Sequence, residues 1–131
     1  MSLMISGLYI SLTALFAIVL AYRVVRLRRI NKVGIGNGKN PELSLAARVH
    51  ANFIENAPFA MALLLVSEAN GMPAILLHAF GTAWLVARML HAIGLTQGQG
   101  GYHFGRFWGV LLTWTVLLGL AVANIGFFLG L

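Results

Sequence analysis

The stretch Ser2–Tyr22, SLMISGLYISLTALFAIVLAY, carries no charged side chain over 21 residues. About 20 mainly apolar residues are enough for a helix to cross the hydrocarbon core of a bilayer. Two further stretches share this property, with 19 residues at Ala69–Ala87 and 25 residues at Phe107–Leu131. We expect each to form a membrane-spanning helix. The first should be retained rather than removed as a signal peptide, because no basic segment precedes it.

A fourth apolar stretch is interrupted by acidic residues. Only 12 uncharged residues separate Glu55 from Glu68, so this helix must begin earlier, near Ser44 or Ala46, to cross the membrane. Glycine, asparagine and proline clusters mark the three turns between the helices. We therefore expect one all-α domain, a four-helix membrane bundle over residues 1–131, with helices at about 2–25, 45–69, 72–95 and 105–130.

The composition excludes several other classes of protein. Hydrophobic residues make up 60% of the chain and charged residues 9%, whereas soluble domains average about 25% charged residues. Disorder needs low hydrophobicity, so it is excluded as well. The chain has no cysteine, and its histidines form no His-Glu-x-x-His motif, so we expect neither a catalytic thiol nor a metal.

Basic residues are confined to one side of the predicted membrane. All nine lysines and arginines belong to the first loop, the third loop or their flanking helix ends. The positive-inside rule then predicts cytoplasmic first and third loops and both termini outside. The net charge of +6 is thereby read as a topology signal, and we expect no nucleic-acid partner.

Polar residues recur at one level of the predicted bundle. Arg48, Asn52 and Glu55 have i, i+4, i+7 spacing, which places them within about 60° on one helix face. Ionisable groups at membrane depth are costly and need a reason, so we interpret this level as a pocket for an anionic ligand. Topology, lipid contact and helix packing remain alternative explanations for single members. The other residues at this level are Arg26, Arg28, Arg29, Arg88, His91 and Arg106.

Three segments resemble one known family. The segment RVHANFIENAPF at 48–59 resembles the second-helix signature of the MAPEG family, the membrane-associated proteins in eicosanoid and glutathione metabolism. The segment RMLHAIGL at 88–95 resembles its third helix, and RLRR at 26–29 resembles its basic exit from the first helix. The resemblance is to the small bacterial branch. It implies a homotrimer in the bacterial inner membrane, with a glutathione site between subunits on the cytoplasmic side.

Positions that match the family carry implied roles in holding glutathione. Arg26 or Arg28 would hold its carboxylates, as a bidentate guanidinium does well. Glu55 would accept its amino group, with Asn52 beside it. Arg48 would support or bind the same ligand.

The remaining matches concern the pocket wall and the chemistry. Arg88 and His91 would complete the wall, and Arg106 matches the arginine that stabilises the glutathione thiolate. A cationic neighbour lowers the pKa of a thiol, so the protein needs no nucleophile of its own. The resemblance implies a glutathione transferase or peroxidase, whose second substrate is a lipophilic small molecule arriving from the membrane lipids.

Four positions depart from the best-studied eicosanoid enzymes. Ala51 stands in place of an arginine, Phe107 in place of a serine, and Leu95 and Val110 in place of tyrosines. A non-enzymatic lipid-binding or scaffold protein on the same fold is therefore an alternative. A small proton-coupled exporter is a further one, although such exporters carry a glutamate in the first helix and Ser2–Tyr22 has none. The glycine pairs 105/109 and 126/130 also suggest close helix packing.

Overall fold

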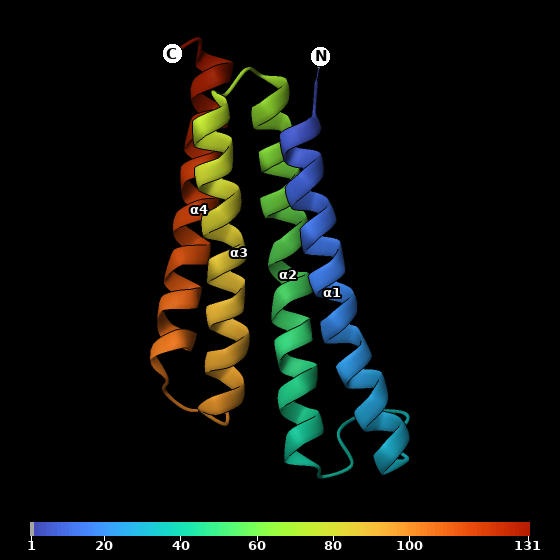
Figure 1. Ribbon diagram of the computed structural model, residues 1–131. Coiled ribbons are helices and arrows are strands. Elements are labelled where there is room, and N and C mark those ends of the chain that lie inside the picture. Colours follow the sequence, from blue (N-terminus) through green and yellow to red (C-terminus); the bar gives the residue numbers. More distant parts are fainter. Residues whose placement is uncertain (1) are drawn as a thin grey trace.

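Four long helices account for most of the chain. The computed structural model describes residues 2–131 and contains α1 (Met4–Asn31), α2 (Pro41–Ala69), α3 (Ala74–Gln97) and α4 (Phe104–Leu129) (Figure 1). Each helix is long and apolar enough to cross a membrane. The predicted all-α bundle of four membrane-spanning helices is thus confirmed.

The helix bounds differ from the expected ones mainly in the first half of the chain. Helix α1 runs to Asn31 rather than to residue 25, with Arg28 and Arg29 in its last turn, where cations favour the helix dipole. Helix α2 begins at Pro41 rather than near residue 45, because the Asn40 side chain caps it by accepting a hydrogen bond from a backbone amide of the first turn. Helix α2 then continues without a break through Pro58.

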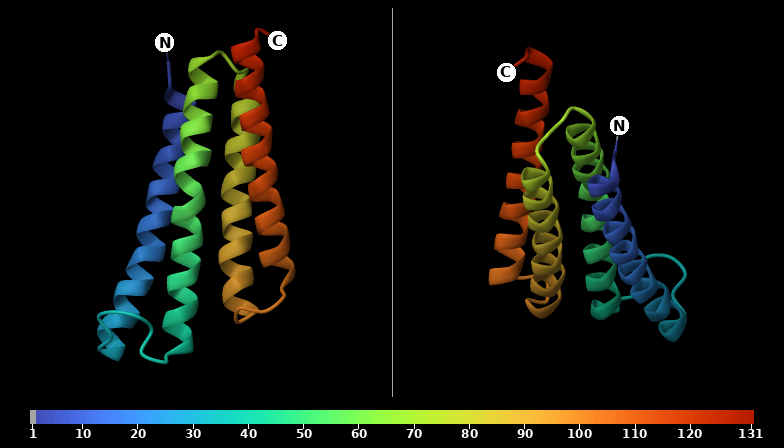
Figure 2. Two further views of the ribbon diagram at one scale, coloured as in Figure 1. Left: turned by 180° about the vertical axis from the view of Figure 1, so that it is seen from behind. Right: turned by 45° about the horizontal axis from the view of Figure 1, so that its top comes forward.

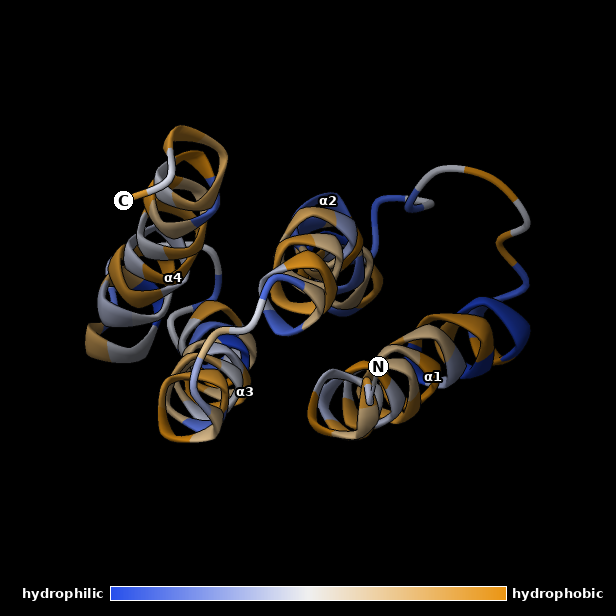
Figure 3. Ribbon diagram, turned by 90° about the horizontal axis from the view of Figure 1, so that it is seen from above, coloured by the Kyte–Doolittle hydropathy of each residue, from blue (hydrophilic) through white to orange (hydrophobic). Residues whose placement is uncertain are grey.

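The helices form two hairpins that meet along α2 and α3. The α1–α2 and α3–α4 loops lie at one end of the bundle, which we call the basic end, and both termini lie at the other (Figures 1 and 2). Seen from above, α1 and α4 lie on opposite sides, with α2 and α3 between them (Figure 3). Within residues 2–131, α1 and α4 make no contact with each other.

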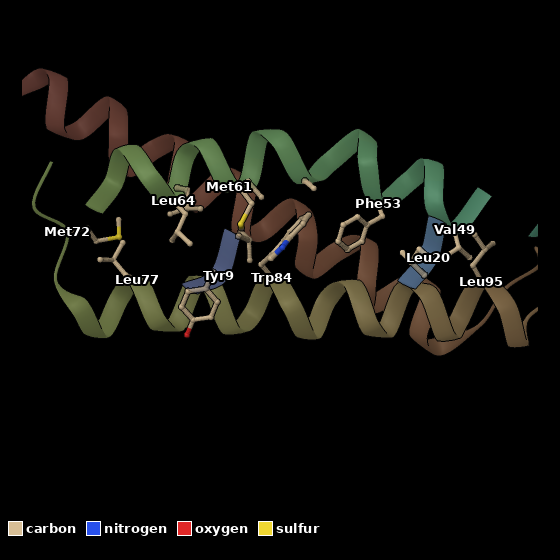
Figure 4. Close-up of a cluster of buried hydrophobic side chains, with 14 residues drawn as sticks. Tyr9, Leu20, Val49, Phe53, Met61, Leu64, Met72, Leu77, Trp84 and Leu95 are labelled. Atoms are coloured by element: carbon tan, nitrogen blue, oxygen red, sulfur yellow. The ribbon is translucent and has the colours of Figure 1, made fainter. Parts of the chain in front are cut away.

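The apolar core lies mainly between α2 and α3. Phe53 is 1% exposed and Trp84 is fully buried, and their rings meet with centroids 6.0 Å apart (Figure 4). The Trp84 indole N–H donates to Thr13 Oγ1 of α1 at 3.0 Å, which satisfies its polar atom in the core. The outer faces of α1 and α4 instead expose large apolar side chains such as Ile18 and Trp114, as expected for surfaces in contact with lipid.

Glycines allow α3 and α4 to approach very closely. A Cβ on Gly109 would lie 2.6 Å from His91 N and 2.8 Å from Ala87 O, and one on Gly105 would lie 2.6 Å from Leu90 O. The predicted close packing at the glycine pair 105/109 is thus confirmed. Within residues 2–131 the pair 126/130 makes no such contact, because a Cβ at either position would meet nothing within 4 Å.

At the end opposite the basic end, Glu68 of α2 caps the N-terminus of α1. Its Oε1 accepts hydrogen bonds from Ser6 N at 2.9 Å and from Ser6 Oγ at 2.6 Å, while its Oε2 accepts one from Ile5 N at 3.2 Å. Helix α1 has no side-chain cap of its own. The carboxylate therefore satisfies first-turn amides that would otherwise lack partners.

Candidate functional site

A cavity of about 960 Å³ opens at the basic end, between the ends of α1 and α3 and the first turns of α2 and α4. We call it the polar cavity. Its charged lining residues are Arg23, Glu42, Arg48 and Arg106, so cations outnumber the single acid there. Asn52 and His91 are also in its lining. Charge and hydrogen-bond donors together make this cavity suitable for an anion.

Four of the predicted site residues therefore meet in one place: Arg48 and Asn52 from α2, His91 from α3 and Arg106 from α4. The last turn of α3 lies against the first turn of α4, and His91 and Arg106 both line the cavity beside this contact. A Cβ on Gly94 would collide with the backbone nitrogen of Arg106. The glycine contact between the two helices thus sets this part of the cavity wall.

Arg88 lies behind the cavity wall rather than in it. The residue is 2% exposed, and its guanidinium donates to Asn52 Oδ1 through Nη2 and to Thr113 Oγ1 through Nη1 at 3.1 Å. The rings of Phe53 and Trp84 lie 5.8 Å and 5.6 Å from its Cζ. Among residues 2–131, no carboxylate pairs with it. Neutral oxygens and aromatic faces thus hold this cation in the bundle.

Glu55 and the predicted arginines of α1 lie outside the polar cavity. Glu55 Oε1 is 3.9 Å from Arg48 Nη1, and both side chains are 59% exposed. Arg26 is exposed. Arg28 donates through Nη1 to the Gly36 carbonyl at 2.7 Å, in the loop that follows α1. A ligand held in the polar cavity of one chain does not have these three residues in its wall.

Two charged lining residues were missed by the sequence reasoning. Arg23 donates through Nη1 to Thr96 Oγ1 at 3.3 Å, which joins α1, about two turns before its end, to the last turn of α3. Glu42 lies in the first turn of α2. The signals were present in the sequence, because Arg23 is the first charge after the apolar stretch and Glu42 follows the Asn40–Pro41 helix start.

Arg106 also lines a second, smaller cavity. This apolar cavity has a volume of about 390 Å³ and lies on the outward face of α4. The Arg106 guanidinium donates through Nη1 to the carbonyls of Gly100 and Gly101 in the preceding loop. Arg106 is thus a lining residue that the two cavities share. The other residues of the apolar cavity include Tyr102, His103, Phe107, Val110, Leu111 and Trp114.

Comparison with known proteins identifies the family. The sequence profile of the MAPEG family matches residues 6–126. The chain belongs to the MAPEG family. It is similar to the inner membrane protein YecN of Escherichia coli K12, with 36% identity over 126 residues, covering 93% of this chain and 91% of that protein. YecN of the Escherichia coli O6:H1 strain CFT073 matches equally well. No solved structure matches the chain.

The four positions that depart from the best-studied eicosanoid enzymes carry no hydroxyl group in this chain. Leu95 is 6% exposed and contributes an apolar surface to the polar cavity. Phe107 and Val110 line the apolar cavity. Ala51 is half-buried on α2. The three positions at the cavities therefore supply shape and apolar surface.

Proposed function

We propose that this MAPEG protein is a glutathione-dependent transferase or peroxidase for lipophilic substrates. The observation that carries the proposal is the position of Arg106, which lines both the polar and the apolar cavity. A water-soluble thiol in the first cavity and a membrane-derived substrate in the second would meet at one guanidinium. This geometry suits a reaction between a charged peptide and an apolar molecule.

The polar cavity supports recognition of glutathione through its two carboxylates. Arg23 and Arg48 provide guanidinium groups that can each form two hydrogen bonds with a carboxylate. Glu42 is the acidic lining residue for the ammonium group. We further propose a homotrimer in which the exposed Glu55 and Arg26 or Arg28 reach the same ligand across a subunit boundary.

The chemistry requires a cation at the sulfur, and Arg106 provides it. A free thiol has a pKa of about 8.5, and a neighbouring guanidinium lowers that pKa and enriches the nucleophilic thiolate. With an electrophile, sulfur forms a bond to carbon and the leaving group departs with the bonding electrons. With a hydroperoxide, sulfur takes the terminal oxygen as the O–O bond breaks and an alcohol leaves. A second glutathione then gives water and the disulfide.

The basic end is proposed to face the cytoplasm, where the reduced glutathione pool is found. The distribution of lysine and arginine supports this orientation. The termini and the α2–α3 turn would then lie on the other side of the inner membrane.

A glutathione titration of the detergent-purified protein tests the proposal. We expect the ultraviolet absorbance of bound thiolate to rise with glutathione and to disappear in Arg106→Ala. Arg29→Ala is the matched control, because Arg29 lies at the same end and lines neither cavity. Conjugation of chlorodinitrobenzene and reduction of cumene hydroperoxide should follow the same pattern. Absence of both glutathione binding and thiolate absorbance in the intact protein would contradict the proposal.

A lipid-binding role is the second candidate, and the lining of the apolar cavity favours it. Phe107, Val110 and Trp114 present an apolar surface beside the expected lipid phase. This alternative predicts that a fluorescent fatty acid binds to the native protein and binds more weakly to the Val110→Trp variant, whose larger side chain fills the apolar cavity. It also predicts that addition of glutathione produces no thiolate absorbance. Observing the thiolate together with turnover would exclude a purely lipid-binding role.

A further inference from the structure

We infer that Arg88 is a positioning residue that orients Asn52 and His91 as hydrogen-bond donors to the polar cavity and so selects ligands with carboxylate groups. The choice of glutathione as the ligand rests on the function proposed above. The orientation of the two side chains does not, because it follows from contacts within the chain.

Arg88 fixes the orientation of the Asn52 amide. An arginine side chain has five N–H donors and no acceptor, so any polar atom that faces it must accept. Asn52 turns its Oδ1 toward Arg88 Nη2, and the Asn56 amide also points at this oxygen, at 3.5 Å. The Asn52 amide nitrogen, with its two donors, is therefore the atom left for the cavity that Asn52 lines.

Arg88 also sets the tautomer of His91. Its Nδ1 lies 3.5 Å from Arg88 Nη2, and this nitrogen must offer its lone pair because the guanidinium only donates. In a neutral imidazole the proton then resides on Nε2. His91 is 3% exposed and lines the polar cavity, so the nitrogen available to a ligand carries a hydrogen.

Arg88 is itself held in one orientation. Its Nη1 donates to Thr113 Oγ1 at 3.1 Å, and that hydroxyl donates to the Gly109 carbonyl at 2.7 Å. Its guanidinium also lies against the rings of Phe53 and Trp84. The contacts come from α2, α3 and α4, so rotation of the side chain would break interactions with all three helices.

The result is a cavity wall dominated by donors. Arg23, Arg48 and Arg106 contribute cations, and Arg88 adds the oriented donors of Asn52 and His91 without touching the ligand. Such a wall matches carboxylate oxygens, which only accept hydrogen bonds when ionised. It disfavours a ligand whose carboxylates are masked as esters.

Nitrogen NMR of histidine-labelled, ligand-free protein in detergent tests the orientation directly. We expect the His91 signals, assigned by their loss in His91→Gln, to show hydrogen on Nε2. Arg88→Met should produce a mixture of tautomers, whereas Arg88→Lys, which keeps a donor cation, should retain most of the Nε2 form. Arg48→Met is the matched control, since it removes a cavity cation without changing the group that faces Nδ1.

Ligand selection is tested by comparing the affinities for glutathione and its diethyl ester. Loss of donors to a charged group should reduce the preference for glutathione about tenfold in Arg88→Met, with partial recovery in Arg88→Lys. Hydrogen on Nδ1 in the native protein would overturn the inference, even if the Arg88→Met protein fails to fold. So would an unchanged tautomer and an unchanged preference in Arg88→Met. Correct tautomers with no glutathione binding would contradict the proposed function instead.

Discussion

Replacing Gly109 with alanine should separate α3 from α4 and destabilise the bundle. The added Cβ would lie 2.6 Å from His91 N, 2.8 Å from Ala87 O and 2.8 Å from His91 Cα. All three atoms belong to the backbone of α3, so no side-chain rotation can relieve the clash. Ordinary van der Waals contact begins near 3.4 Å, so the helices would have to separate by about 0.8 Å to accommodate the alanine Cβ.

The expected magnitude follows from two opposing effects. Overpacking of this kind costs about 1–3 kcal/mol, while alanine improves helix propensity over glycine by about 1 kcal/mol. Gly126 in the same helix provides a matched control, because a Cβ there would meet nothing within 4 Å. The propensity gain is shared by both variants. The difference between them in free energy of unfolding should therefore be the overpacking cost alone.

Reversible unfolding in mixed micelles, followed by circular dichroism, measures this difference. Gly126→Ala should unfold at the same or higher denaturant than the native protein, and Gly109→Ala at lower denaturant. The second variant should also bind glutathione more weakly, because separating the helices moves Arg106 away from His91. Equal unfolding midpoints for the two alanine variants would refute the close contact between α3 and α4.

Three further predictions use the same unfolding measurement. Glu68→Gln should cost about 1–3 kcal/mol, because the negative charge and one of the two oxygens that accept hydrogen bonds from α1 are lost; an unchanged midpoint would show that the cap is dispensable. Thr13→Val should cost about 1–3 kcal/mol, because the Trp84 indole N–H is left unpaired in the core; a stability gain would contradict that pairing. A double-mutant cycle on Arg48 and Glu55 should give less than about 1 kcal/mol, because both side chains are 59% exposed. A larger coupling in that cycle would mean the pair is buried in the assembled protein.

The sequence predicted the helices well because the membrane imposes a simple requirement. A charge-free stretch of sufficient length must be helical to satisfy its backbone in lipid, and α3 and α4 begin and end within two residues of expectation. The two helix ends at the first loop were predicted less well. Arginine-rich turns after residue 25 can still be helical outside the hydrocarbon, so charge marks the membrane boundary rather than the end of α1.

The site was predicted only in part, for a geometric reason. Helical periodicity gives the angles among Arg48, Asn52 and Glu55, but it does not say where the neighbouring helices lie. In the structure one part of that face is turned toward the bundle interior, where Asn52 contacts Arg88. Another part is turned outward, where Glu55 is exposed. The short contact between α3 and α4 that brings Arg106 to the cavity depends on packing across a turn. The spacing of Gly105 and Gly109 indicated a close contact, but it did not indicate which side chains that contact would bring into the cavity.

The arginines of the site divide into two kinds, and the division argues for a ligand. Arg23 donates to a hydroxyl and Arg106 donates to loop carbonyls. Arg48 faces an exposed carboxylate, and an exposed ion pair of this kind contributes about 1 kcal/mol at most. Arg88 instead has buried partners inside the bundle. A topology signal requires cations near the cytoplasmic loops, but it does not require three of them to line one cavity. An anion entering this cavity would gain charge-assisted hydrogen bonds without first breaking a strong ion pair.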